Sequence, residues 1–165
     1  MIKNGFLISQ EKVFNLIKSV YESTDTFAAN FEQEHASVND LSCYLDTIKL
    51  QHGSLFLVAQ KEKHLQGYIL IKPRTQRKLQ HTADLNMGVL ETEQGKGLGN
   101  KLLNTALNQL KNERIIEILY LMVRSDNLHA IRLYEKNGFD KLAILSRDTK
   151  IESQYFDGIL MRKFV

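Results

Sequence analysis

The sequence predicts a single α/β domain with one continuous mixed sheet over residues 1–165. Strand-like segments alternate with amphipathic helical segments in the order strand, two helices, three strands, helix, strand, helix and two strands. Hydrophobic residues make up 43% of the chain, which is enough for one substantial core. No internal repeat, low-complexity tract or linker divides the sequence into two domains.

The N-terminal third is expected to hold one short strand and two helices. Residues 3–8 predict the strand, and the apolar residues within 13–21 recur at helical spacing. Residues 23–36 lose this periodicity and predict a loop. Ser37 followed by Asp40 resembles a capping box and begins the second amphipathic helix.

The middle of the chain predicts three strands. Residues 54–60 and 65–72 are strand-like and are separated by a polar turn, so we expect them to form a hairpin. The basic residues 74–78 predict a solvated connection, because no aromatic residue is interleaved with them. Residues 81–90 predict the next strand, and Gly88 near its end indicates a bulge or a close backbone approach.

The C-terminal half predicts two helices and three strands. A helix with a continuous apolar face runs from Leu98 to Leu110, and residues 115–123 are apolar enough for a central strand. Asn127 stands at the N-cap position of a shorter helix, and Gly138 stands where a glycine ends it. Two further strands are expected over 139–148 and 155–165.

Composition and charge exclude several classes of function. A net charge of +3 slightly favours anionic ligands but is too small for a typical nucleic-acid-binding surface. The longest apolar run, residues 115–123, is too short to span a membrane, and the N-terminus has no apolar stretch of signal-peptide length. The five histidines form no metal-binding motif. With one cysteine, Cys43, we expect a soluble cytoplasmic protein that binds no metal, nucleic acid or membrane.

Three glycines between Gln94 and Asn100 lie at the junction of the expected fourth strand and the following helix. A dinucleotide fingerprint that starts at Gly95 requires a third glycine where Asn100 stands. A P-loop requires a glycine at the same position and a hydroxyl residue where Leu102 stands. The stretch therefore lacks residues that the chemistry of both motifs needs.

The same stretch still favours an anion. Backbone N–H groups in the first turn of a helix lack partners, and the helix dipole attracts negative charge there. Glycines leave room for a phosphate to approach the backbone, and Lys96 and Lys101 add positive charge. On this segment alone, the alternatives are an anion-binding turn and a plain helix start with nothing bound.

Two segments resemble the GCN5-related N-acetyltransferase (GNAT) superfamily. Residues Gln94 to Gly99 are similar to its acyl-CoA-binding turn, Gln/Arg-x-x-Gly-x-Gly/Ala. Residues Asn127 to Phe139 resemble its second signature, in which an asparagine is followed by alanine three residues later and then by Leu-Tyr-x-Lys-x-Gly-Phe. Residues 154–161 also resemble the last strand of the family.

The resemblance implies a fold and a cosubstrate. The expected sheet is twisted and mostly antiparallel, has about seven strands flanked by about four helices, and splays apart between the fourth and fifth strands. Acetyl-CoA is implied as the cosubstrate, with no metal. Its pantetheine arm would bond to the backbone of Met87, Gly88 and Val89. Its pyrophosphate would lie on the backbone amides of Gln94, Gly95, Lys96, Gly97, Leu98, Gly99 and Asn100.

The resemblance also implies roles for individual side chains. Asn127 matches a residue that contacts the cofactor, and Tyr134 matches the tyrosine that protonates the departing CoA thiolate. Asp84 falls where some relatives carry a glutamate that takes the proton of the amine, directly or through water. Asp84 could equally orient a cationic amine or form an ion pair. Cys43 lies outside these motifs, so direct attack is implied rather than an acyl-cysteine intermediate. Glu91 replaces the proline that many relatives have.

The sequence specifies the acceptor less closely than the cosubstrate. In relatives the first two helices and the last two strands wall the acceptor site, which implies residues 23–37 and 146–157 here. Glu32, Glu34 and Asp157 could attract a cationic amine or could simply be solvated. We expect a primary amine of a small molecule or of a protein N-terminus, and a homodimer is compatible with the resemblance. The alternative is a non-catalytic CoA-binding sensor or interaction module on the same fold.

Overall fold

The computed structural model describes residues 1–27 and 30–165. It contains seven strands: β1 Ile2–Asn4, β2 Leu55–Lys61, β3 His64–Pro73, β4 Thr82–Val89, β5 Ile118–Arg124, β6 Asp140–Ile151 and β7 Gln154–Phe164. Its helices are α1 Gln10–Glu22, α2 Phe31–Glu34, α3 Val38–Lys49, α4 Leu98–Glu113 and α5 Leu128–Lys136. Short 3-10 turns lie at Gly5–Leu7, Arg77–Leu79 and Glu91–Glu93.

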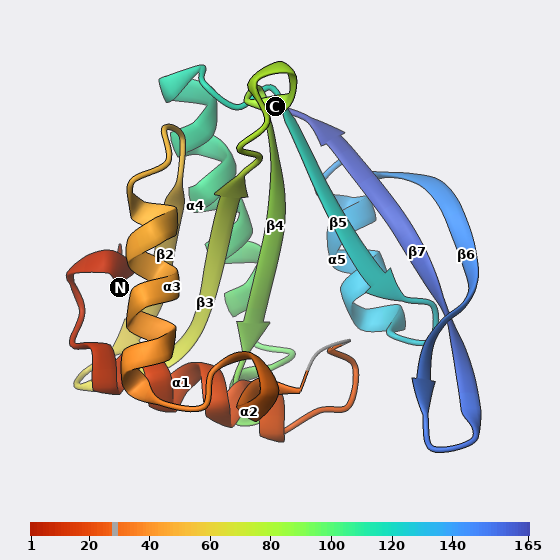
Figure 1. Cartoon of the computed structure of the whole chain (residues 1–165), viewed down its shortest axis with the longest axis horizontal. Coiled ribbons are helices and arrows are strands. Elements are labelled where there is room, and N and C mark those ends of the chain that lie inside the picture. Colours follow the sequence, from red (N-terminus) through yellow and green to blue (C-terminus); the bar gives the residue numbers. More distant parts are fainter. Residues whose placement is uncertain (28–29) are drawn as a thin grey trace.

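The strands form one sheet in the order β1-β2-β3-β4-β5-β7-β6 (Figure 1). All neighbouring strands are antiparallel except β4 and β5, which run parallel. Strand β7 returns between β5 and β6, so β6 lies at the edge of the sheet. The prediction of a mixed, mostly antiparallel sheet of seven strands is confirmed.

The sheet divides at β4 and β5. Their pairing register covers only Thr82–Asp84 and Ile118–Tyr120 within the described residues. Beyond Asp84 the two strands diverge, and β4 continues to Val89 beside β3 alone (Figure 1). The predicted splay is confirmed, and it leaves the edge of β4 from Leu85 to Val89 facing a gap in the pairing.

Helices cover both faces of the sheet. Helices α1 and α3 pack on one face, where Val20, Leu41 and Phe56 belong to one buried cluster. Helices α4 and α5 pack on the opposite face, behind the strands in Figure 1, where Leu103 and Ile131 belong to a second cluster. The second cluster includes residues from both sides of the gap, because α4 contacts β2, β3 and β4 and Leu119 of β5 joins the same cluster. The helical layer therefore connects the two parts of the sheet.

Local sequence signals set the helix ends as predicted. The Ser37 hydroxyl accepts a hydrogen bond from the Asp40 amide and donates one to the Asp40 carboxylate, at 3.2 and 2.8 Å. The Asn127 side chain accepts a hydrogen bond from the Ala130 amide at the start of α5. Gly138 has φ 79° just past the end of α5, a conformation that favours glycine.

Two details differ from the sequence-based expectations. The first strand ends at Asn4, because the Asn4 side chain accepts a bond from the Phe6 amide and starts a 3-10 turn. The expected loop over 23–36 contains the single-turn helix α2, capped by Asn30, which gives five helices rather than about four. That loop also includes Ala28 and Ala29, which lie outside the described residues.

Candidate functional site

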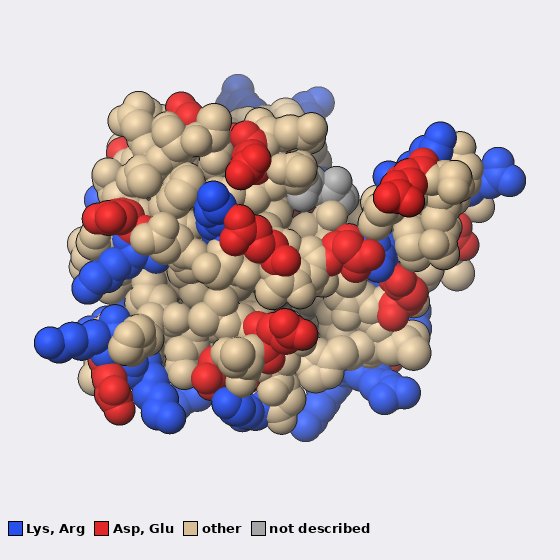
Figure 2. All heavy atoms as spheres, turned by 90° about the horizontal axis from the view of Figure 1, so that it is seen from below, with Lys and Arg blue, Asp and Glu red and all other residues tan. Residues whose placement is uncertain are grey.

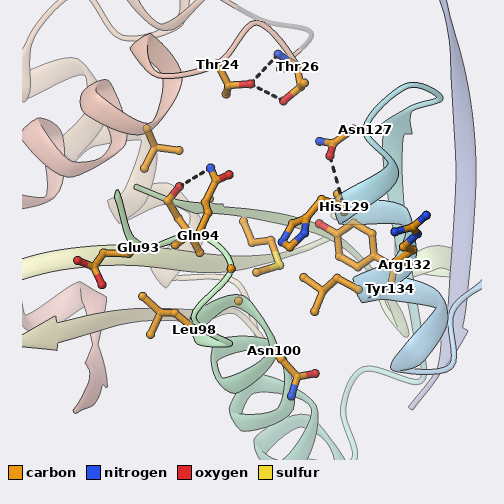
Figure 3. Close-up of a pocket in the computed structure, with 18 of the residues that line it drawn as sticks. Thr24, Thr26, Glu93, Gln94, Leu98, Asn100, Asn127, His129, Arg132 and Tyr134 are labelled. Carbon is orange, nitrogen blue, oxygen red and sulfur yellow. Dashed lines mark hydrogen bonds between the residues drawn. The ribbon is translucent and has the colours of Figure 1, made fainter. Parts of the chain in front are cut away.

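A cavity of about 400 Å³ lies where the end of β4, the start of α4 and one face of α5 meet. Most of the residues singled out in the sequence line it. These are Met87, Gly88, Val89, Gln94, Gly95, Gly97, Leu98, Gly99, Asn100, Asn127 and Tyr134. Lys96 and Asp84 are not among the lining residues of this cavity. Segments that are about 40 residues apart in the sequence therefore form one site, shown in Figure 3.

The glycine turn presents bare backbone to the cavity. Gly95 and Gly97 have φ values of 73° and 79°, and a Cβ added to either would meet nothing within 4 Å. The amides from Gly95 to Asn100 make no hydrogen bond of good geometry to the described part of the chain, whereas the Lys101 amide bonds to the Gly97 carbonyl. Unpaired amides at the positive end of a 16-residue helix form a site suited to an anion.

Side chains fix the shape of this turn. The side-chain amide of Gln94 donates to the Val89 carbonyl at 3.2 Å, which ties the turn back to the end of β4 (Figure 3). The Lys96 ammonium lies 3.4 Å from the Glu93 carboxylate, an exposed contact that partly compensates its charge. Lys96, which does not line the cavity, therefore adds little to the positive potential there.

Asn100 connects α4 to α5. Its side-chain oxygen accepts a hydrogen bond from the Asn137 side chain at 2.9 Å. The Asn104 side chain donates both to the Asn137 side chain and to the Asn100 carbonyl. The residue that stands where a dinucleotide fingerprint has its third glycine thus joins the two helices that border the cavity.

Gly88 serves packing rather than an open turn. A Cβ at Gly88 would lie 2.4 Å from Val20 of α1 and 3.0 Å from the ring of Tyr68. The close approach at Gly88 is therefore made by side chains, the β3–β4 register shows no bulge there, and the missing Cβ lets α1 lie against β4.

Tyr134 projects from α5 into the cavity (Figure 3). The residue is 7% exposed, and its hydroxyl has no hydrogen-bond partner among the described residues. Burial raises the pKa of Tyr134 well above its ordinary value, so the hydroxyl remains protonated at neutral pH. The side chain offers an unengaged proton donor inside the site.

Sequence reasoning missed a face of α5. His129, Arg132, Leu133 and Lys136 also line the cavity. Their spacing of three, four and seven residues from His129 places them on one side of a helix, and this signal was available in the sequence. Two of them carry permanent positive charge, which adds to the anion preference of the glycine turn.

A second cavity of about 440 Å³ adjoins the first on the α1 and α3 side of the sheet. Tyr134, Asn127, Met87 and Phe27 line both cavities, so the two meet at the gap between β4 and β5. Four aromatic side chains that line the second cavity are Tyr21, Phe27, Tyr44 and Tyr68. The two cavities therefore share Tyr134 and the end of β4.

Asp84 lines the second cavity but already has a partner. The Arg74 guanidinium donates to both carboxylate oxygens of Asp84, at 2.7 and 3.3 Å, and stacks 4.6 Å from the Tyr120 ring. The hydrogen bonds that Arg74 donates to Asp84 raise the pKa of Arg74. The neighbouring Lys72 lies 5.1 Å from the Tyr44 ring.

Two tyrosines that line this cavity are Tyr68, which is buried, and Tyr21, which is partly buried. The Tyr68 hydroxyl donates to the Asn86 side chain at 2.8 Å. Burial, with the carboxylate of Glu34 as a smaller cause, raises the pKa of Tyr21 to about 12, and burial also raises the pKa of Tyr68. Both hydroxyls are therefore neutral at physiological pH.

Nothing in the described residues indicates a metal site, since no three His, Cys, Asp or Glu side chains group as ligands. None of the helices in residues 1–27 and 30–165 is both long and apolar enough to cross a membrane.

Comparison with known families matches residues 13–139 to the model described as "Acetyltransferase (GNAT) family". An N-alpha-acetyltransferase from Saccharolobus solfataricus is 32% identical over 118 residues. That match covers 66% of this chain and 66% of the relative, so the chain spans just under two thirds of that relative's length.

Solved structures show the same fold. An acetyltransferase of the GNAT family from Streptococcus pneumoniae superposes with a TM-score of 0.93 at 22% identity, over 100% of this chain and 99% of that one. A phosphinothricin acetyltransferase from Sinorhizobium meliloti, solved in complex with acetyl-CoA, superposes with a TM-score of 0.85 at 17% identity, over 100% and 88% of the two chains.

Proposed function

Because this chain belongs to the acetyltransferase (GNAT) family, we propose that it transfers an acetyl group from acetyl-CoA to a primary amine of a small molecule or of a protein N-terminus. The observation that carries the proposal is the meeting of two cavities at Tyr134, one beside an anion-binding turn and one open to an acceptor. The name of the archaeal relative supports the protein N-terminus as one acceptor class.

The residues of the first cavity fit the parts of acetyl-CoA. The unpaired amides from Gly95 to Asn100 would hold its pyrophosphate. The backbone amide of Gln94, also expected there from the sequence, instead donates to the Glu91 carbonyl at 3.1 Å. The backbone of Met87, Gly88 and Val89, which faces the gap beside β5, would bond the pantetheine arm. Asn127 lines the same cavity and would contact the cosubstrate. Bound acetyl-CoA supplies an acetyl group activated as a thioester.

Tyr134 holds the proton that the leaving sulfur needs. In the balanced reaction a nitrogen–carbon bond forms, the carbon–sulfur bond breaks, the amine loses one proton and the sulfur gains one. Burial disfavours the charged form of a thiolate as it does that of a tyrosine, so the proton affinities of the two groups rise together. The hydroxyl of Tyr134 is free to donate because it has no partner among the described residues.

Asp84 is the proposed acceptor of the amine proton, directly or through water. It is the carboxylate of β4 that lines the second cavity. The two hydrogen bonds that it accepts from Arg74 keep it oriented. Cys43 is exposed on α3 and lines neither cavity in the described structure, which supports direct attack by the amine rather than transfer through a thiol.

The test is release of CoA thiol from acetyl-CoA in the presence of a panel of amines that includes short diamines, amino-acid amides and peptides with free N-termini. Turnover with at least one amine is expected, without added metal. Binding of CoA without turnover on any amine would favour a non-catalytic CoA-binding sensor or interaction module instead.

We also propose a cytoplasmic homodimer. The single Cys43 supports the compartment, since one cysteine cannot form an internal disulfide. The edge strand β6 supports the dimer, because in the described chain it pairs with β7 alone, has one free edge and exposes Leu142, Ile144 and Leu145. Cell fractionation and analytical ultracentrifugation test these two proposals separately.

A further inference from the structure

The β6–β7 hairpin carries an irregularity beside the second cavity, which is called the acceptor cavity below because the amine is proposed to bind there. The register of β6 against β7 shifts between Leu145 and Thr149, and Arg147 within that stretch has φ 55°. The Arg147 amide donates to the Asp157 carboxylate at 2.8 Å, which fixes this bulge. Bulges of this kind change the direction of the side chains that follow them.

The side chain that the bulge redirects is Asp148. Asp148 lines the acceptor cavity together with Arg124 and Tyr134, and it is exposed, as are most residues of β6. Its carboxylate lies directly over Gly158 of β7, because a Cβ at that position would be 2.5 Å from Asp148 Oδ2 and 2.8 Å from its Cγ. The absence of a side chain at Gly158 is therefore what admits this carboxylate.

Among the carboxylates on the hairpin side of the acceptor cavity, Asp148 is the one that has no partner among the described residues. The nearby Arg124 forms ion pairs with Asp25 and Asp126, at 3.1 and 2.7 Å, so two carboxylates already compensate its positive charge. Asp157 is occupied by the bulge itself. Figure 2 views the molecule from the end where the hairpin stands clear of the body, and acidic side chains are spread over the middle of this face.

The opposite wall carries one charge of each sign. Glu34 and Lys72 both line it, with opposite charges, and the aromatic rings of Tyr21 and Tyr44 lie among them. Aromatic faces accept cationic and methylene groups well. The unbalanced charge in the cavity therefore lies on the hairpin side.

Resting on the acetyltransferase function proposed above, we propose that Asp148 binds a positive charge of the acceptor, so that the preferred acceptor is an amine that carries a second cationic group. The reacting amine lies toward Tyr134, and the second cation lies against the β6–β7 hairpin. Asp148 is thus a specificity-determining residue, and its neighbour Gly158 is required for its position.

The experiment compares acceptors that differ by one ammonium group. Diaminopentane is paired with pentylamine, and lysinamide is paired with norleucinamide. In each pair the wild type is expected to show kcat/KM about 5-fold higher for the doubly charged member. In Asp148→Asn this ratio is expected to fall to about 2 or below for each pair, with acetyl-CoA affinity unchanged.

Two further variants sharpen the test. Gly158→Ala should lower the same ratio, because the new methyl group displaces the carboxylate, and Asp148→Asn/Gly158→Ala should lower it no further. Asp140→Asn is the matched control, since it removes a carboxylate from the same strand at an exposed position away from the cavity.

An unchanged ratio in Asp148→Asn would overturn the inference. So would wild-type turnover of a singly charged panel amine with no preference within either pair. In both cases thiol release would still occur, so the proposed acetyltransferase function would stand. Absence of turnover on the whole panel would instead contradict that function.

Discussion

The Arg124 guanidinium donates to the backbone carbonyl of Asp25 at 2.8 Å, although 99 residues separate the two in the sequence. The same guanidinium bonds both carboxylate oxygens of Asp126, at 2.7 and 3.0 Å, and lies 4.1 Å from the Phe156 ring. Its side chain is only 6% exposed. This contact ties the segment after α1 to the end of β5, so it joins the two sides of both cavities.

Replacing Arg124 by lysine is expected to destabilise the protein by about 2 kcal/mol, because an ammonium group cannot reproduce the planar fork that serves Asp25 and Asp126 together. Urea denaturation measures the change. Arg77→Lys, in an exposed 3-10 turn, is the control for the chemical substitution itself. Equal free energies of unfolding for Arg124→Lys and the wild type would show that the contact contributes nothing to stability.

Gly97→Ala is expected to lower acetyl-CoA affinity by about 10-fold or more, because the added methyl group projects into open space beside the unpaired amides. Its cost in stability is about 1 kcal/mol, from a positive φ with a Cβ. Isothermal titration with CoA checks the first effect. Gly138→Ala is a matched control, since Gly138 also has φ 79° but does not line the cavity. Equal losses of affinity in the two variants would contradict a role for the turn in binding.

Tyr134→Phe is expected to lower kcat by about 100-fold while leaving CoA affinity within a few-fold of the wild type, because only the proton donor is removed. Steady-state kinetics and titration with CoA separate the two effects. Phe139, whose ring lies 5.5 Å from that of Tyr134, indicates that an aromatic ring without a hydroxyl is accommodated in this part of the core. A normal kcat in the variant would remove Tyr134 as the acid.

Asp84→Asn is expected to lower kcat/KM about 10-fold near neutral pH, with a smaller deficit near pH 10, where more of the amine is already deprotonated. The measurement is a pH profile of kcat/KM. Arg74→Met removes the partner and leaves the carboxylate in place. If both variants lowered stability equally and left the profile unchanged, Asp84 would be an ion-pair residue and not a base.

The protein is expected to lose stability in alkali. Burial raises the folded-state pKa of Tyr68 and Tyr134 above the unfolded value of about 10, and that of Tyr21 to about 12. Above pH 10 the unfolded state therefore binds fewer protons than the folded state, and the free energy of unfolding falls as pH rises. The stabilisation is complete below about pH 10 and falls by about 1.4 kcal/mol per pH unit for each fully buried tyrosine.

Urea denaturation between about pH 9 and pH 11.5 measures this slope. Tyr68→Phe should make it shallower, whereas Tyr155→Phe, at an exposed position of β7, should not. The same slope in both variants would show that buried tyrosines are not the cause.

Much of the fold could be predicted because its signals are local. The capping pair of Ser37 and Asp40, the stop at Gly138 and the apolar periodicity of α4 each act within a few residues. The helix α2 was missed because four residues are too few to show periodicity, and its cap at Asn30 is a single residue.

The cavity residues likewise divide into those that local sequence motifs predict and those that they do not. The glycine turn and Tyr134 belong to continuous motifs, whereas Asp148 becomes a cavity residue only through a bulge and a bare glycine on the neighbouring strand. The sequence also did not reveal that Arg74 is the partner of Asp84. Arg74 lies in the basic stretch 74–78, and nothing in these five residues indicates which of them contacts Asp84. Contacts of this kind depend on strand register, which the sequence pattern does not specify to the residue.

The three-residue ladder between β4 and β5 also bears on how the chain folds. Strands β1 to β4 pair in chain order, and β5, β6 and β7 pair among themselves, so each half of the sheet forms from contacts within its own stretch of sequence. Joining the halves requires both to exist, and few backbone bonds contribute to the joint. We expect this seam to close last during folding, with α4 packing as the step that drives it.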